Sequence, residues 1–228
     1  MPFLIVLTAL FIGTLAVLLF VAKRNRGRYA LAKGVCSLLF VAAGVLAWVM
    51  GEGGSRQRFF LLLAALLLCA FGDVLLGVAN RKAANLDKRY FVAGALSFAV
   101  AHVLFVLLFA ALAPFRWYDW APSVLLMGVL LALDKTGSVQ LGKMRPLAYV
   151  YTALIGLMFW KALGGLLFAP APGPGAVLAC IGAALFLLSD VILLFLYFGV
   201  RRFQWLRSAN LLTYYVGIYL LSLAAFWL

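Results

Sequence analysis

Charged side chains are scarce in this chain. Of its 228 residues only 11% are Asp, Glu, Lys or Arg, with six acidic residues and one histidine. Hydrophobic residues make up 68%, and the mean hydropathy is +1.15. A water-soluble domain has about 25% charged residues, so this chain has too few to cover the surface of a soluble globule. The composition predicts a polytopic membrane protein without a soluble domain.

Several signatures of metal and nucleophilic sites are also absent. One histidine, three isolated cysteines and no H-E-x-x-H leave too few ligands at usable spacing for zinc. No G-x-S-x-G and no glycine-rich phosphate loop occurs. The odd number of cysteines predicts buried thiols instead of a disulfide framework. We therefore expect no metal and no cofactor, which leaves carboxylate chemistry.

Long apolar runs are what the chain has in place of charge. A transmembrane helix needs about 20 predominantly apolar residues. Eight runs approach or exceed this length, at 2–22, 29–50, 58–79, 90–113, 117–133, 144–168, 174–198 and 206–227. The fifth is the shortest, and aromatic residues typical of a membrane interface surround its start. The sequence predicts an all-α membrane protein with eight transmembrane helices in a single domain, 1–228.

The net charge of +13 is unevenly distributed. Fourteen of the 19 basic residues lie in four loops, whereas the opposite side carries only Arg56, Arg58 and Arg116. The positive-inside rule makes the four basic loops cytoplasmic and places both termini outside. We expect an integral protein of a bacterial inner membrane, with anionic lipid head groups as partners of the basic face. No nucleic-acid partner is expected, and the oligomeric state stays open.

A shift of 117 residues aligns the two halves of the chain. It places Asp73 on Asp190, within "DVLL" and "DVIL". The same shift makes three further pairs: Arg28 with Arg145, Phe98 with Tyr215, and His102 with Tyr219. Four helices separate the copies, so the pattern favours a parallel 4+4 repeat with halves of approximately 1–113 and 114–228. Chance matches between leucine-rich segments are the alternative.

Asp73 and Asp190 are acids inside apolar runs. A charged side chain at the centre of a membrane helix costs roughly 2.5–3.5 kcal/mol on insertion scales, so such acids are functional candidates by default. Each lies about fifteen residues from the outer end of its run, which predicts that both face one cavity in the cytoplasmic half. A buried ion pair or structural hydrogen bonds are the alternative.

Further polar residues are predicted to bind the substrate in the same inward-opening pocket. They are Lys33, Asn80, His102, Tyr149, Tyr215 and Tyr219, with Thr152 nearby. For Lys33 the alternative is an amine that snorkels to the interface, and for His102 it is a hydrogen bond between helices. Lys161, toward the outer half, is interpreted as a snorkelling residue.

Five segments, in this order and spacing, together resemble a known family: "LAKGVCSLL", "FGDVLL", "FAVAHVLF", "GAALFLLSDVILL" and "TYYVGIYLL". They resemble the YhhN-like lysoplasmalogenases. The resemblance implies a membrane hydrolase that cleaves the vinyl ether bond of lysoplasmenylethanolamine or lysoplasmenylcholine, releasing a fatty aldehyde and glycerophosphoethanolamine or glycerophosphocholine. It implies Asp73 and Asp190 as catalytic acids and Lys33 and His102 as pocket residues. The chain departs from the family pattern at Gly34, where proline is frequent, and at Ile218, where Gln or His is common.

Paired buried acids suit vinyl ether hydrolysis. The reaction begins with proton transfer to carbon, and the resulting oxocarbenium ion is trapped by water. Two neighbouring buried carboxyl groups share one proton, so that one donates and the other stabilises the cation, as in glycoside cleavage. Which acid donates stays open. The phosphate is expected near Lys33, Arg28 and Arg145. A proton-coupled transporter is the competing prediction, because parallel repeats and midplane acids also occur in transporters.

Overall fold

The computed structural model describes residues 2–24, 26–51, 54–80, 86–168, 172–201 and 203–227. These residues form eight α-helices and three short 3-10 helices, with no strand among them. In chain order the helices are α1 (Pro2–Arg24), α2 (Arg26–Met50), α3 (Arg56–Ala79), α4 (Lys88–Ala110), η1 (Trp117–Trp120), α5 (Ala121–Lys135), η2 (Gly142–Met144), α6 (Arg145–Leu167), α7 (Pro174–Phe198), α8 (Trp205–Leu223) and η3 (Ala224–Trp227). The prediction of an all-α fold is confirmed for the described residues.

Seven helices in the described part of the chain are long and apolar enough to cross a membrane, which confirms a multi-pass membrane protein. The exception is α5, whose 15 residues extend about 22 Å, less than the roughly 30 Å of a hydrocarbon core. Asp119 accepts a hydrogen bond from the backbone N–H of Arg116, and the segment between Arg116 and α5 turns as the 3-10 helix η1. The predicted span 117–133 is thus divided between η1 and α5, and its crossing stays a prediction.

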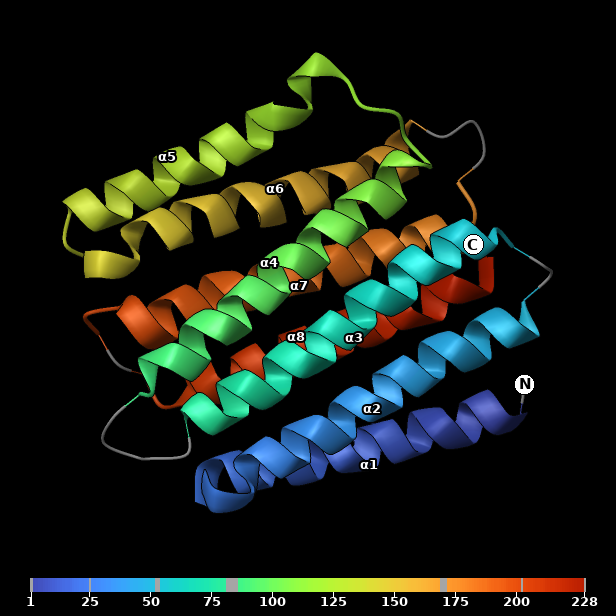
Figure 1. The fold of residues 1–228 in the computed structure, drawn as a ribbon, viewed down its shortest axis with the longest axis horizontal. Helices are drawn as coiled ribbons and strands as arrows, with labels where there is room; N and C mark the ends of the chain where they lie inside the picture. Colours follow the sequence, from blue (N-terminus) through green and yellow to red (C-terminus); the bar gives the residue numbers. More distant parts are fainter. Residues whose placement is uncertain are drawn as a thin grey trace.

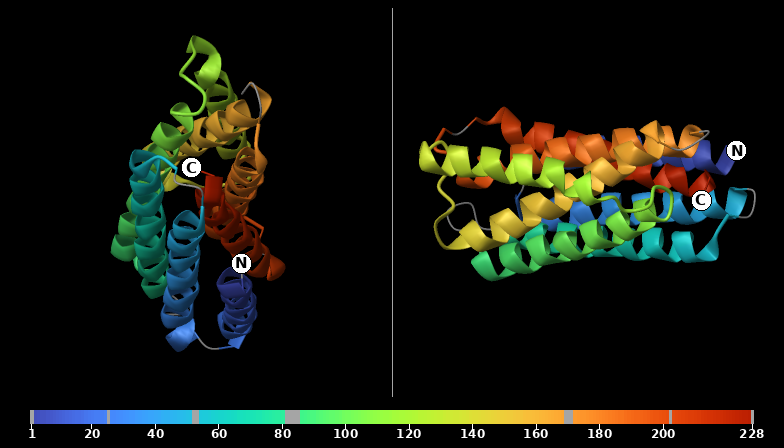
Figure 2. Two further views of the ribbon diagram at one scale, coloured as in Figure 1. Left: turned by 90° about the vertical axis from the view of Figure 1, so that its right-hand side faces the viewer. Right: turned by 90° about the horizontal axis from the view of Figure 1, so that it is seen from above.

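The helices run roughly alongside one another, with α1 and α2 at one edge of the bundle and α5 at the other (Figures 1 and 2). Consecutive helices pack from α1 to α4 and again from α5 to α8. Between these two sets, α2 contacts α8 and α4 contacts α6. The main neighbours of the helices in the first set therefore recur in the second, although the contacts of α1 and α3 with α8 have no counterpart of similar extent between α4 and α5 or α7.

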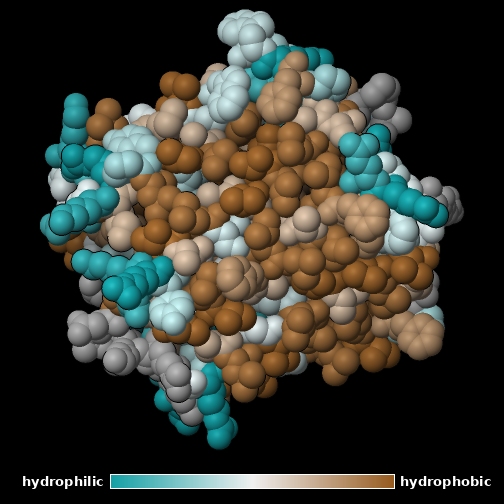
Figure 3. Space-filling model, viewed as in Figure 1, coloured by the Kyte–Doolittle hydropathy of each residue, from teal (hydrophilic) through white to brown (hydrophobic). Residues whose placement is uncertain are grey.

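The two ends of the bundle are built from different loops. At one end, Gln140 N–H donates to the carbonyl of Phe198 and Val200 N–H donates to that of Ser138, joining the α5–α6 and α7–α8 connections. The first turn of α1 and the helix η3 both lie at the opposite end, apart from each other (Figures 1 and 2). Apolar side chains cover the middle of the face in Figure 3, and hydrophilic ones gather toward the ends. This is the surface that a bilayer requires.

Small residues bring the helices around the site close together. A Cβ on Gly182 of α7 would lie 2.7 Å from the carbonyl oxygen of Gly217 on α8. A Cβ on Gly77 of α3 would lie 2.6 Å from the Cα of Ala30 on α2. Membrane helices associate through packing of this kind, since lipid and side chains are equally apolar. The close approach allows short polar side chains to reach across from one helix to the next.

Candidate active site

A polar cavity lies inside the bundle, between α2, α3, α7 and α8. Its polar lining residues are Tyr29, Lys33, Asp73, Asn80, Ser189, Asp190, Tyr197, Arg207, Asn210 and Tyr214. Tyr197 and Asn80, which belong to this lining, lie near the ends of α7 and α3 that adjoin the loops with many basic residues. Both intramembrane acids thus contribute to the wall of one cavity.

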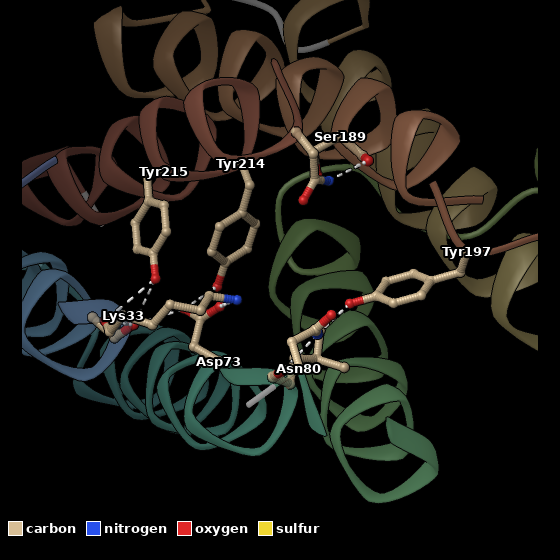
Figure 4. A network of polar contacts seen from close by, with 10 residues as sticks. Lys33, Asp73, Asn80, Ser189, Tyr197, Tyr214 and Tyr215 are labelled. Carbon is tan, nitrogen blue, oxygen red and sulfur yellow. Dashed lines mark hydrogen bonds and ion pairs between the residues drawn. The ribbon is translucent and has the colours of Figure 1, made fainter. Parts of the chain in front are cut away.

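Asp73 is completely buried and has three partners from two other helices. Its Oδ1 lies 2.8 Å from Lys33 Nζ, while its Oδ2 accepts hydrogen bonds from the hydroxyls of Ser37 at 2.7 Å and Tyr214 at 2.9 Å. Lys33 and Ser37 are four residues apart and therefore share one face of α2. Figure 4 shows the α2 and α8 side chains converging on Asp73. Lys33 is only 5% exposed, so its amine pairs with Asp73 and does not snorkel.

Asp190 has different surroundings. Its Oδ2 accepts a hydrogen bond from the Tyr151 hydroxyl at 3.1 Å, and His102 Nε2 lies 3.7 Å from the same oxygen. Within the described residues, no lysine or arginine is within 4.0 Å of this carboxyl group. His102 is buried between the rings of Tyr151 and Phe186, and neither ring nitrogen has a hydrogen-bond partner among those residues. Asp190, whose side chain is 10% exposed, is thus a largely buried acid without a lysine or arginine counter-ion.

Asp190 also borders an apolar groove of about 150 Å³. Side chains of α4, α5, α6 and α7 form most of its walls, including Phe91, Leu130 and Ile155. The groove and the polar cavity share Leu76, Phe98, Asp190, Leu193 and Tyr197. Among the described residues, Asp190 is the one carboxyl group common to both spaces. The acid therefore lies where an apolar environment meets a polar one.

The other predicted site residues divide into two sets. Asn80 lines the polar cavity and donates to the hydroxyl of Tyr197 at 2.6 Å, as Figure 4 shows. Tyr215 lies behind the cavity, with its hydroxyl 3.3 Å from the carbonyl oxygen of Lys33. Tyr219 instead shares a hydrogen bond of 2.7 Å with Thr8 of α1. The structure brings Asn80 to the acids and places these two tyrosines outside the cavity lining.

Tyr149 packs against the small cluster of Leu130, Val139 and Leu141 near the α5–α6 connection, and of these Leu130 also lines the groove. Neither the groove nor the polar cavity includes Tyr149 in its lining. The neighbouring Thr152 lines the groove. One face of α6 thus points toward Asp190, and Tyr149 lies outside it.

The interpretation of Lys161 as a snorkelling residue is wrong. Its side chain is only 2% exposed, and its Nζ lies 2.8 Å from Asp119 Oδ2 and donates to the carbonyl of Pro114 at 3.0 Å. The Trp160 indole N–H donates to the other oxygen of Asp119 at 2.9 Å. The segment that leads into α5 folds against α6 and supplies a carboxylate at the depth of the amine. The amine is therefore neutralised inside the bundle and has no need to reach the interface.

Three residues of α8 complete the cavity and were not predicted. Arg207, Asn210 and Tyr214 all line it. Their spacing of three and four residues puts them on one face of a helix, a pattern that was available in the sequence. Asn210 donates to the carbonyl of Ser189 at 2.7 Å and so joins α8 to α7 beside Asp190.

Together, the fold and the site define a polytopic α-helical membrane protein with a buried cavity that contains two acids. Residues 28–225 match the YhhN family, and the chain belongs to that family. It is 30% identical over 195 residues to lysoplasmalogenase TMEM86A of Homo sapiens, covering 83% of this chain and 73% of the relative. Identity to the Bos taurus protein of the same name is 29% over the same shares. No solved structure matches the chain.

Proposed function

We propose that this protein is a lysoplasmalogenase, which hydrolyses the vinyl ether bond of lysoplasmenylethanolamine or lysoplasmenylcholine. The observation that carries the proposal is the position of Asp190, between an apolar groove and a polar cavity. The vinyl ether of such a lipid also joins two unlike parts, a hydrocarbon chain and a glycerophospho group. A chain in the groove and a polar group in the cavity bring the bond between them to Asp190. The names of the two mammalian relatives support the same activity.

The two acids take different roles in this proposal. Asp190 is largely buried and lacks a lysine or arginine partner, which favours the neutral carboxylic acid. The hydrogen bond that Tyr151 donates acts in the opposite direction and stabilises the carboxylate that is left after proton transfer. Asp73 is paired with Lys33 and accepts two hydroxyl hydrogen bonds, which favours the carboxylate. Asp190 is therefore the proton donor, and the Asp73–Lys33 ion pair supplies a fixed dipole whose negative end, the Asp73 carboxylate, stabilises positive charge on the substrate.

The reaction consumes one water and needs no net proton. Asp190 transfers its proton to the vinyl carbon farther from the ether oxygen, and the electron pair of the double bond forms the new C–H bond. Water adds to the neighbouring carbon of the oxocarbenium ion, and its proton returns to Asp190. The C–O bond between the hemiacetal carbon and the glycerol oxygen then breaks, the hydroxyl oxygen of the hemiacetal becomes the aldehyde carbonyl, and its proton moves to the departing glycerol oxygen. The products are a fatty aldehyde and the glycerophospho alcohol.

Turnover by purified protein in detergent micelles tests the function. We expect release of fatty aldehyde from lysoplasmenylethanolamine and none from its alkyl ether analogue, which has no double bond to protonate. The ester analogue should also resist, because the proposed mechanism has no nucleophile. A folded preparation that releases no aldehyde would contradict the proposal and favour a transporter, which needs a sealed compartment. Ester cleavage at a comparable rate would indicate a nucleophilic lipase mechanism.

We further propose that the chain is a single domain of two parallel four-helix repeats that crosses a bacterial inner membrane eight times with both termini outside. The recurring helix neighbours support the repeat, as does the hydrogen bond between Asn80 and Tyr197, which are 117 residues apart. The α5 helix leads from the end near Pro114 to the end near Phe198 and so supplies the eighth crossing. The basic loops then face cytoplasmic anionic lipids. A cytoplasm-specific reporter fused after the C-terminus should stay silent, and a bright one would exclude this orientation.

A further inference from the structure

We propose that Arg207 forms a phosphate-binding subsite in the polar cavity and selects phospholipid substrates over lipids without a phosphate. This inference rests on the proposed function. The sequence places the phosphate near Lys33, Arg28 and Arg145, and the structure leads to a different residue.

Arg207 is a half-buried cation that lines the polar cavity together with both acids. Its guanidinium carbon lies 5.8 Å from the ring centre of Tyr29, and no carboxylate of the described residues is within ion-pair distance. Arg207 is also the third residue of α8, where the positive end of the helix dipole disfavours a cation. A bound anion would neutralise the charge of Arg207 and would also interact favourably with the positive end of the α8 dipole.

The charges of the cavity indicate which anion fits. Lys33 approaches the same Tyr29 ring, at 5.9 Å, but Asp73 neutralises its charge at 2.8 Å. When Asp190 is the neutral proton donor, the charge of Arg207 gives the cavity a net charge of one positive unit. The phosphodiester of a lysophospholipid carries one negative charge, and a guanidinium binds phosphate oxygens through two parallel hydrogen bonds. The cavity therefore matches this group in sign and in magnitude of charge.

Two other basic residues at this end of the bundle are less suitable for binding the phosphate. Arg145 pairs with Asp134 through a contact of 2.6 Å and does not line the cavity. Arg201 is exposed and also lies outside the lining. Arg207 instead shares a cavity with Asp190, so one lipid can reach both residues, with its phosphate at the arginine and its vinyl ether at the acid.

The test compares two substrates with the same alkenyl chain, lysoplasmenylethanolamine and the phosphate-free 1-alkenylglycerol. In Arg207→Gln, we expect KM for the phospholipid to rise about ten- to hundredfold, with kcat nearly unchanged, because a charge-assisted contact to the phosphate is lost. Cleavage of the alkenylglycerol should not change. Arg207→Lys should recover part of the lost affinity, since it keeps the charge without the planar fork. Arg201→Gln, which removes the same charge at the same end of the bundle, should behave as wild type.

Several outcomes would overturn the subsite. An equal loss on both substrates would show that Arg207 acts on the acids or on the fold, and unchanged kinetics on both would show that it does not bind the phosphate. If the wild type cleaves neither lipid, the proposed function fails. A binding measurement then tests separately whether Arg207 forms a phosphate subsite. In that case wild type should bind the uncleavable alkyl ether lysophospholipid more tightly than the matching alkylglycerol, and Arg207→Gln should lose this preference. The same preference in both proteins would reject the subsite.

Discussion

The surroundings of Asp73 and Asp190 differ in charge, although both acids line one cavity. Their local sequences are also similar, because Asp73 is followed by Val-Leu-Leu and Asp190 by Val-Ile-Leu. Asp73 lies against Lys33 at 2.8 Å and has two hydroxyl donors. Asp190 has one hydroxyl donor and a histidine at 3.7 Å, and it borders hydrocarbon side chains. Two residues of the same type and local sequence thus acquire different chemistry from the helices that pack against them.

Asp190→Asn should have the largest effect on activity. An amide keeps the size and can accept the Tyr151 hydrogen bond, but it has no acidic proton, and general acid catalysis contributes about 10²–10⁴-fold to rates. We expect aldehyde release to fall by at least this factor, with the Tm in detergent close to that of wild type. Substantial turnover by a folded Asp190→Asn protein would remove this acid from the role of proton donor.

Asp73→Asn should reduce both activity and stability. Removing one partner of a buried ion pair leaves the Lys33 ammonium without its counter-charge, which costs about 3–5 kcal/mol. Thermal unfolding in detergent should therefore show a lower Tm than for Asp190→Asn. The double variant Lys33→Met with Asp73→Asn should regain stability but stay inactive. Equal Tm values for the two single variants would contradict the distinction between the acids.

Removal of single hydroxyl donors should give the smallest effects. Tyr151→Phe deletes the one hydroxyl bond to Asp190, and a hydrogen bond of about 1–1.5 kcal/mol corresponds to roughly five- to tenfold in turnover. Tyr214→Phe is the matched change at Asp73, which keeps Lys33 and Ser37. We expect Tyr214→Phe to alter kcat less than Tyr151→Phe does. The reverse order would indicate that Asp73 depends on its hydroxyl donors more than on its ion pair.

Membrane helices and lone acids were predictable because both depend on local sequence. Apolar runs show their length directly, and Asp73 and Asp190 stand out within them. The partners of the acids were less predictable, since the rotation of each helix decides whether Lys33 meets Asp73 or points to the interface. Arg207 was counted among the basic loop residues, where its charge indicated topology but not its position in the cavity.

The ion pair of Lys161 shows the same limit at the other end of the bundle. Its carboxylate comes from Asp119, 42 residues away, in a segment whose aromatic residues suggested only an interfacial position. Nothing in the local sequence of α6 indicates this partner. The ion-pair partner of a buried lysine in a membrane helix can therefore be identified only when the packing of the neighbouring segments is known.

The junction at Asp190 also bears on the fate of the products. Under the proposed chemistry, the bond breaks between an apolar groove and a polar cavity, so the two products begin in different environments. A long-chain aldehyde partitions into the bilayer, whereas a glycerophospho alcohol dissolves in the aqueous phase. Once the products have entered separate phases they rarely meet again, and the hemiacetal cannot readily re-form. The site that divides the substrate thus also directs its two products toward different phases.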